Sequence, residues 1–157
     1  MDQWLPSWAE ASSAIQWAEE VEKIKLYASS IIVQLREEFQ VGGKHDSVGL
    51  KFEDPKSDRS IASIRSPIAN GRIRLEFVVD STVVSGRLVV ERESYTLSDE
   101  RTWLEVWALR CNGDERLWIN LPGDAEEIDL RGYNSQDWAL KRYKLGLFIY
   151  YALAHKP

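Results

Sequence analysis

Residues 72–79 read RIRLEFVV, and this stretch carries the clearest strand signal in the chain. Ile73, Leu75, Phe77 and Val79 occupy every second position and alternate with Arg72, Arg74, Glu76 and Val78. Successive side chains of a β-strand point to opposite faces, so this alternation predicts a strand with one buried face. The fold is therefore expected to be built around a sheet.

Further strand signals flank this stretch on both sides. Asn112-Gly113 separates two apolar runs, which is the pattern of a β-hairpin turn, and Ser85-Gly86 predicts a bulge within its strand. Polar turns separate the other runs, so we expect a mainly antiparallel sheet of six or seven strands. The other expected strands are 48–52, 61–64, 82–93, 103–111, 116–121 and 125–130.

A long amphipathic helix is predicted before the sheet. Ser7-Trp8-Ala9-Glu10 has the pattern of a capping box, and Gly42-Gly43 follows the expected helix end near Gln40. Such a helix would be about 50 Å long, so either a break near Ser29-Ser30 or a partner on the overhang is expected. Its predicted apolar stripe is Trp8, Ala11, Ile15, Ala18, Val21, Ile24, Ala28, Ile31, Leu35 and Phe39.

A second helix is predicted from Ser135 to the end of the chain. It is apolar almost all round, which is typical of a helix buried against a sheet or another molecule. Gly146 lies inside it, and an interior glycine costs about 0.5–1 kcal/mol relative to alanine. We therefore expect the first helix or a strand to cross closely at Gly146. The order of elements predicts a single α+β domain, residues 1–157, with the C-terminal helix packed on the sheet.

Composition narrows the classes of function. The 157 residues carry a net charge of −5, and the pI of about 5.1 argues against nucleic-acid or anionic-membrane partners. Cys111 is the single cysteine, so no internal disulfide is expected. The start of the chain resembles no signal peptide, and Leu145–Ala154, the longest apolar run, is too short to cross a membrane. We expect a soluble cytoplasmic protein.

Motifs for catalysis, metals or cofactors are not found. His45, which is expected to be a solvated loop residue, His155 and Cys111 do not form a metal-ligand pattern. We expect no catalytic residue, no metal and no cofactor, and therefore no enzyme. Glu105 is the one unusual carboxylate, since Trp103 and Trp107 flank it on what we expect to be the same strand face. Glu105 either lies in an aromatic surround or, as we favour, pairs with an arginine across the sheet.

The leading hypothesis is a non-enzymatic protein-binding domain, such as an adaptor, a small chaperone or an inhibitor-type partner. The first helix is longer than the domain needs, and the last helix is apolar all round. Exposed aromatic side chains are common at the centre of protein interfaces. We expect a protein partner or a homo-oligomer, with Trp4, Trp17 and Trp118 as candidate partner-binding residues.

The alternative hypothesis is a small-molecule binder with an apolar pocket between the sheet and the C-terminal helix. Its candidate ligand-binding residues are Trp103, Glu105, Trp107, Tyr143 and Tyr150. An enzyme that uses Glu105 is a weaker hypothesis. Nucleic-acid binding is also weaker, because the arginines that favour it are expected to be solvated and paired with the acidic segment 94–130. On the sheet these arginines are Arg65, Arg72, Arg74 and Arg87, and a second basic cluster is expected at Arg131, Lys141, Arg142 and Lys144.

Overall fold

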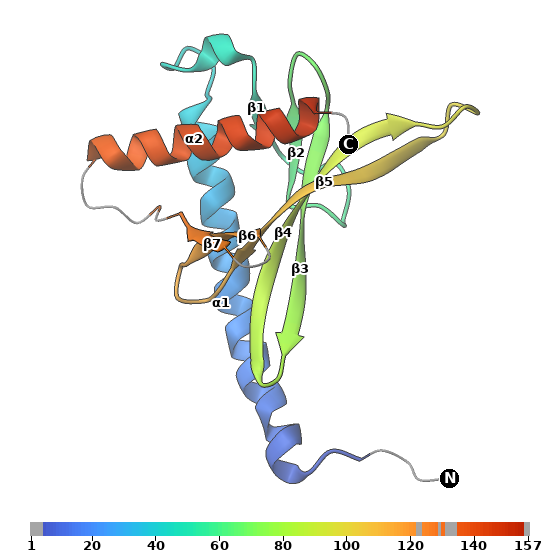
Figure 1. Cartoon of the computed structure of the whole chain (residues 1–157), viewed down its shortest axis with the longest axis vertical. Helices are drawn as coiled ribbons and strands as arrows, with labels where there is room; N and C mark the ends of the chain where they lie inside the picture. The colour runs from blue at the N-terminus through green and yellow to red at the C-terminus, as the bar shows by residue number, and fades with distance from the viewer. Residues whose placement is uncertain (1–4, 122–123, 129, 131–134, 156–157) are drawn as a thin grey trace.

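The computed structural model describes residues 5–121, 124–128, 130 and 135–155. The predicted α+β class is confirmed, because two helices pack on a seven-stranded antiparallel sheet (Figure 1). Asp46–Val48 adds one turn of 3₁₀-helix. In chain order the elements are α1 (Trp8–Glu38), β1 (Lys51–Glu53), β2 (Ala62–Arg65), β3 (Gly71–Asp80), β4 (Val83–Tyr95), β5 (Arg101–Cys111), β6 (Leu117–Leu121), β7 (Asp124–Glu127) and α2 (Ser135–Ala154).

The sheet is a meander in which each strand pairs with the next one along the chain, from β1 to β7. The longest pairings join β3 to β4 and β4 to β5. In Figure 1 the sheet is curled, and the far end of the β4–β5 hairpin projects away from the helices. Short connections between consecutive strands explain this order, since two-stranded antiparallel units need only tight turns.

The first strand is shorter than the alternation predicts. Asp46–Val48 folds as 3₁₀-helix, and Gly49 then adopts a left-handed backbone with φ of 78°. Glycine tolerates this conformation because it has no Cβ. The Asp46 carboxylate accepts hydrogen bonds from the Gly42 amide and from Lys51, and these contacts lower its pKa, with the Lys51 bond having the largest effect. Local hydrogen bonding therefore replaces strand pairing before Lys51.

The bulge predicted at Ser85-Gly86 is wrong. Gly86 pairs regularly with Phe77 of β3 and with Cys111 of β5. A Cβ on Gly86 would lie 2.6 Å from the Ile24 side chain and 2.8 Å from the sulfur of Cys111. The glycine is therefore required for the close approach of α1 to β4.

The bulge lies instead in β5, at Val106. Val90 of β4 is opposite Trp107, whereas the next residue, Glu91, is opposite Glu105. Val106 is the extra residue between them, and one extra residue turns the side chains beyond it to the other face of the sheet. The shift therefore separates Trp107 from Glu105.

Both helices cover the same face of the sheet, which we call the inner face. α1 buries Ile24, Ile31 and Leu35 there, and α2 buries Leu145 and Ile149. The core continues through Leu88, Val90, Leu109 and Cys111 of the central strands. Burial raises the pKa of the Cys111 thiol to about 11, so the thiol stays protonated at neutral pH.

Half of the capping box predicted at the start of α1 is confirmed, since the Glu10 amide donates to the Ser7 hydroxyl at 3.1 Å. The Glu10 carboxylate accepts from the Ser7 hydroxyl, at 3.1 Å, where the capping box predicts the Ser7 backbone amide. The helix continues without a break through Ser29-Ser30 and ends at Glu38, slightly before the expected Gln40.

The predicted apolar stripe of α1, by contrast, is only half right. Its residues recur more closely than 3.6 per turn, so the line moves round a straight helix, and Ile24 lies about 160° from Trp8. As a result, Trp8 and Ile15 are exposed, whereas Ile24 is fully buried.

The close crossing predicted at Gly146 is confirmed, and the crossing group is the residue that caps α1. A Cβ on Gly146 would lie 2.1 Å from the ring of Phe39, which is fully buried. The two helices therefore approach each other where α2 has no side chain. Within the described part of the chain, no helix is long and apolar enough to cross a membrane.

Candidate functional site

The prediction that Trp103, Glu105 and Trp107 share one strand face is wrong. Because of the bulge at Val106, Trp107 lies on the inner face and packs edge-on against Phe148 of α2, with ring centroids 6.1 Å apart. Trp103 and Glu105 point to the opposite, outer face of the sheet.

The two tyrosines proposed for an apolar pocket lie elsewhere. Tyr143 stacks on His45 with ring centroids 3.8 Å apart, and Tyr150 packs against the core. His45 is mostly buried and lies 3.4 Å from the Glu38 carboxylate, so the expectation of a solvated histidine is wrong.

A groove of about 330 Å³ does lie between the sheet and α2. Trp107 is the one predicted residue that lines it. The lining residues are Val106, Trp107, Phe148, Tyr151, Ala152 and His155.

The predicted partner-binding tryptophans have different surroundings. Trp4 lies outside the described residues. Trp17 is half-buried, and its indole N–H donates to the carbonyl of Thr82 at 2.9 Å, which ties α1 to the β3–β4 turn. Trp118 is half-buried and lines a hollow of about 480 Å³ together with Val83 and Arg110. Trp17 therefore has a structural role that its sequence position did not reveal.

The outer face of the sheet carries alternating arginine and glutamate side chains, which we call the Arg–Glu ladder. Glu91 accepts hydrogen bonds from Arg72 at 2.8 Å and from Arg74 at 2.6 Å. Arg74 also binds Glu76, and this bond is the main reason why the pKa of Glu76 is lowered. Its six members are Arg72, Glu91, Arg74, Glu76, Arg87 and Glu105.

The ladder decides between the two interpretations of Glu105. This carboxylate pairs with Arg87 of the neighbouring strand, as the favoured interpretation predicts. Three of the four sheet arginines considered for nucleic-acid binding belong to the ladder, and Arg65 pairs with Glu53 at 3.6 Å. Most of their carboxylate partners come from β1, β3 and β4 rather than from the acidic segment 94–130.

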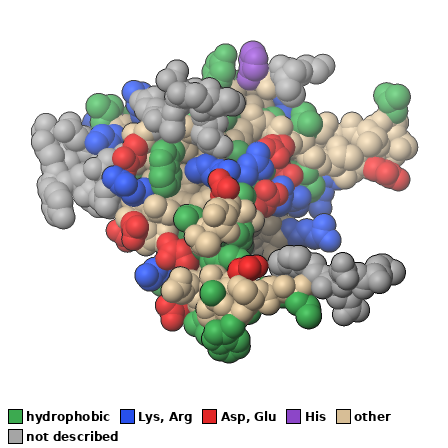
Figure 2. All heavy atoms as spheres, turned by 60° about the horizontal axis from the view of Figure 1, so that its bottom comes forward, with side chains coloured by type: hydrophobic (Ala, Val, Ile, Leu, Met, Phe, Trp, Pro, Cys, Tyr) green, Lys and Arg blue, Asp and Glu red, His purple; other side chains and the backbone are tan. Residues whose placement is uncertain are grey.

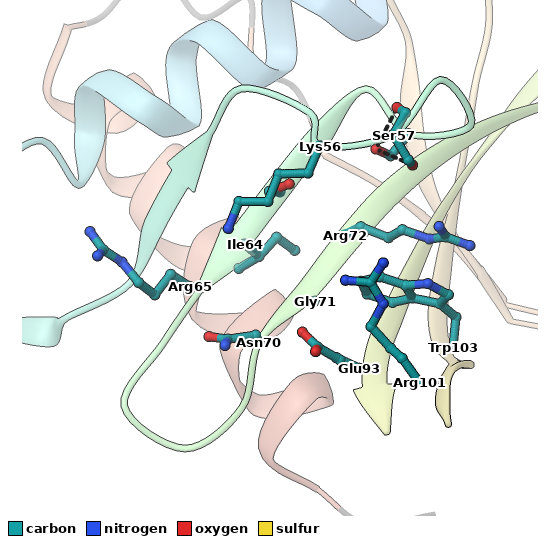
Figure 3. Close-up of a pocket in the computed structure, with 12 residues that line it drawn as sticks. Lys56, Ser57, Ile64, Arg65, Asn70, Gly71, Arg72, Glu93, Arg101 and Trp103 are labelled. Atoms are coloured by element: carbon teal, nitrogen blue, oxygen red, sulfur yellow. Dashed lines mark hydrogen bonds between the residues drawn. The ribbon is translucent and has the colours of Figure 1, made fainter. Parts of the chain in front are cut away.

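A pocket of about 290 Å³ opens at one end of the Arg–Glu ladder, and we call it the Trp103 pocket (Figure 3). The connection between β1 and β2 forms one wall, and strands β2 to β5 supply the remainder. Polar side chains dominate the lining. Its residues are Lys56, Ser57, Ser60, Ser63, Ile64, Arg65, Asn70, Gly71, Arg72, Glu93, Arg101 and Trp103.

Positive charge exceeds negative charge around this pocket. The guanidinium carbon of Arg72 lies 4.1 Å from the centroid of the Trp103 ring, and that of Arg101 lies 5.5 Å away. Of the described lining residues, Glu93 alone carries a carboxylate, and it accepts a hydrogen bond from the Tyr95 hydroxyl. Among the described residues, no ion pair engages Lys56 or Arg101. The pocket therefore has two cations available to an anionic ligand.

A second feature is an exposed apolar line on α1, which we call the outer stripe. It consists of Trp8, Ile15, Leu26 and Val33, which are 86%, 67%, 73% and 51% exposed. Leu26 lies two residues from the buried Ile24, which is about 200° round the helix. The outer stripe therefore runs along the side of α1 that faces away from the core.

The outer stripe extends along the whole helix. In Figure 1 the N-terminal part of α1 continues beyond the sheet, and Figure 2, which brings this end forward, shows hydrophobic side chains exposed among charged ones.

Comparison with known proteins gives no family for this chain. No family model matches it, and neither a curated protein nor a solved structure shows significant similarity. Within the described ranges, no group of three or more His, Cys, Asp or Glu side chains is arranged to hold a metal ion. A functional proposal must therefore rest on the Trp103 pocket and the outer stripe.

Proposed function

We propose that this chain is a protein-binding domain rather than an enzyme, and that the outer stripe of α1 is its binding surface. The observation that carries the proposal is the exposure of Trp8, Ile15, Leu26 and Val33 on one line of α1, whose opposite line is buried from Ile24 to Leu35. Water contact with exposed apolar side chains is unfavourable, and clusters of them are typical of interaction surfaces. The outer stripe forms two such pairs, Trp8 with Ile15 and Leu26 with Val33, and the polar Glu19 and Glu22 lie between the pairs.

The spacing within the outer stripe favours another helix as the partner. Ile15 follows Trp8 by seven residues, Leu26 follows Ile15 by eleven, and Val33 follows Leu26 by seven. Seven residues make about two helical turns and eleven make about three, so the four side chains stay on one side. Apolar residues at such intervals form the contact line between packed helices.

We assign the partner as a second copy of this chain. The intervals between the four residues of the outer stripe, seven, eleven and seven, read the same from either end of α1. If two α1 helices pack antiparallel, with their twofold axis midway between residues 20 and 21, Trp8 meets Val33 of the other copy. Ile15 then meets Leu26. Each copy presents the same surface to the other, which is the requirement for a twofold symmetric interface.

The proposed axis places Glu19 of one copy level with Glu22 of the other, and neighbouring lysines offset this repulsion: Lys25 pairs with Glu22 at 3.3 Å within one chain. Glu19 and Lys23 lie on one side of the outer stripe, near the proposed twofold axis. Antiparallel packing brings Glu19 of one copy beside Lys23 of the other, and symmetry repeats the pair. Within one chain, the Lys23 ammonium lies 3.9 Å from the Glu20 carboxylate. An exposed ion pair of this kind contributes little stability. Lys23 is therefore available for the contact between copies.

Size-exclusion chromatography with light scattering tests this proposal. The natural chain is expected to elute as a dimer, and the double variant Ile15→Glu/Leu26→Glu as a monomer. Burial of an unpaired charge is costly, so the dissociation constant should rise by about 100-fold or more. Both replaced side chains are exposed in a single chain, and circular dichroism should therefore show an unchanged helix content.

Ile68→Glu is the matched control, because Ile68 is 62% exposed on the β2–β3 connection and lies off α1. This variant should remain a dimer. A monomeric natural chain, or a double variant that still forms dimers, would contradict the proposal.

A further inference from the structure

We infer that the Trp103 pocket binds a small sugar phosphate. The cations of the pocket come from four different elements: Lys56 from the β1–β2 connection, Arg65 from β2, Arg72 from β3 and Arg101 from β5. Arg65 is paired with Glu53 at 3.6 Å, so the other three carry the inference. Figure 3 shows Lys56 on one side of the space and Arg101, beside the Trp103 ring, on the other. A ligand between them would meet positive charge from both sides.

The donors in the pocket suit a phosphate group. Arg72 uses its Nε to bind Glu91, which leaves the two terminal nitrogens of its guanidinium for a further acceptor. Trp103 supports the Arg72 guanidinium from beneath, at 4.1 Å, and cation–π contact of this kind fixes its orientation. Arginine and lysine bind phosphate oxygens through short, charge-assisted hydrogen bonds. A dianion gains more from these cations than a single carboxylate does.

Hydroxyl and carboxylate groups in the wall favour a ligand that also carries hydroxyls. Ser63 is buried, and no hydrogen bond within the described residues engages its side chain. Glu93 supplies an acceptor, and Asn70 supplies both a donor and an acceptor. A sugar hydroxyl can donate a hydrogen bond to the Glu93 carboxylate. A fully ionised phosphate cannot, because it has no O–H group.

The size of the pocket limits the ligand. A volume of about 290 Å³ lies at the lower end of the range for small-molecule sites. It admits a pentose or hexose phosphate, whereas a nucleic-acid strand would need an extended groove. The pocket lies on the outer face of the sheet, and the outer stripe lies on a helix of the inner face. Ligand binding is therefore independent of the self-association proposed above.

Isothermal titration calorimetry with ribose 5-phosphate, inorganic phosphate and ribose tests the inference. Ribose 5-phosphate should bind, inorganic phosphate should bind more weakly, and ribose should not bind. Lys56→Ala and Arg101→Ala should each weaken binding of ribose 5-phosphate by about tenfold or more. Glu93→Gln should weaken ribose 5-phosphate but not inorganic phosphate.

Arg59→Ala is the matched control, because Arg59 is an exposed cation of the same connection that does not line the pocket. Its affinity for ribose 5-phosphate should be unchanged. Absence of binding at millimolar ligand would overturn the inference, and so would equal losses in Arg59→Ala and Lys56→Ala. The double variant Ile15→Glu/Leu26→Glu should bind normally, so failure of the dimer and failure of the pocket can be distinguished.

Discussion

Glu91→Ala is expected to lower the free energy of unfolding by about 3–5 kcal/mol. Glu91 is only 7% exposed, and its carboxylate neutralises both Arg72 and Arg74. Removal of the carboxylate leaves two largely buried guanidinium groups without their shared partner. The loss of one member of a buried ion pair is costly because the remaining charge stays desolvated.

Urea denaturation of Glu91→Ala and Glu105→Ala measures this effect. Glu105 belongs to the same Arg–Glu ladder and pairs with Arg87, but its side chain is 43% exposed, against 9% for that of Glu91. Its replacement should cost at most about 1 kcal/mol. Equal losses in the two variants would show that burial of Glu91 does not govern the strength of the ladder.

Gly146→Ala is expected to destabilise the protein by about 1–3 kcal/mol, although alanine has the higher helix propensity. The added methyl group would lie 2.1 Å from the ring of Phe39, which is fully buried. Either the ring or α2 must therefore move. Urea denaturation gives the sign of the change, and a more stable variant would contradict the close packing of α1 and α2.

A double-mutant cycle with Phe39→Leu identifies the cause. Leucine lacks the ring atoms nearest to Gly146, so Gly146→Ala should cost less in the Phe39→Leu background than in the natural chain. An equal cost in both backgrounds would mean that Phe39 is not the group that excludes the methyl.

The sequence predicted the elements more accurately than the faces that they bury. Alternation at 72–79 and the Asn112-Gly113 turn depend on local chemistry, and both appear in the structure as β3 and the β5–β6 connection. The bulge at Val106 has no such local signal, because valine is an ordinary strand residue. Only its pairing with β4 reveals the extra residue.

The first helix was ambiguous for a related reason. Apolar residues occur on two opposite sides of α1. A series of steps of three and four residues can pass gradually from one side of the helix to the other. A rule based on spacing alone joins Trp8 and Ile15 to Ile24, although they face different ways. Which side is buried depends on where the sheet lies, and no local pattern contains that information.

The Trp103 pocket was even less accessible to prediction. From the sequence, Arg72 belongs to a basic cluster that favours nucleic-acid binding, whereas Trp103 is a candidate for an apolar ligand pocket. They meet because β3, β4 and β5 pair in a particular register. Lys56 lies in a segment that composition identifies only as a turn.

Disulfide trapping of Ile15→Cys and Leu26→Cys proteins tests the antiparallel dimer most directly. Cys111 is buried and its thiol has a pKa of about 11, so it should contribute no background reaction. In an antiparallel dimer these two positions face each other across copies. Two copies of position 15 are instead about 16 Å apart along the helices, which is too far for a disulfide.

The two variant proteins should therefore cross-link when mixed under mild oxidation, and neither should cross-link alone. No cross-link in the mixture would contradict the proposed interface, and rapid cross-linking of Ile15→Cys alone would contradict its antiparallel direction.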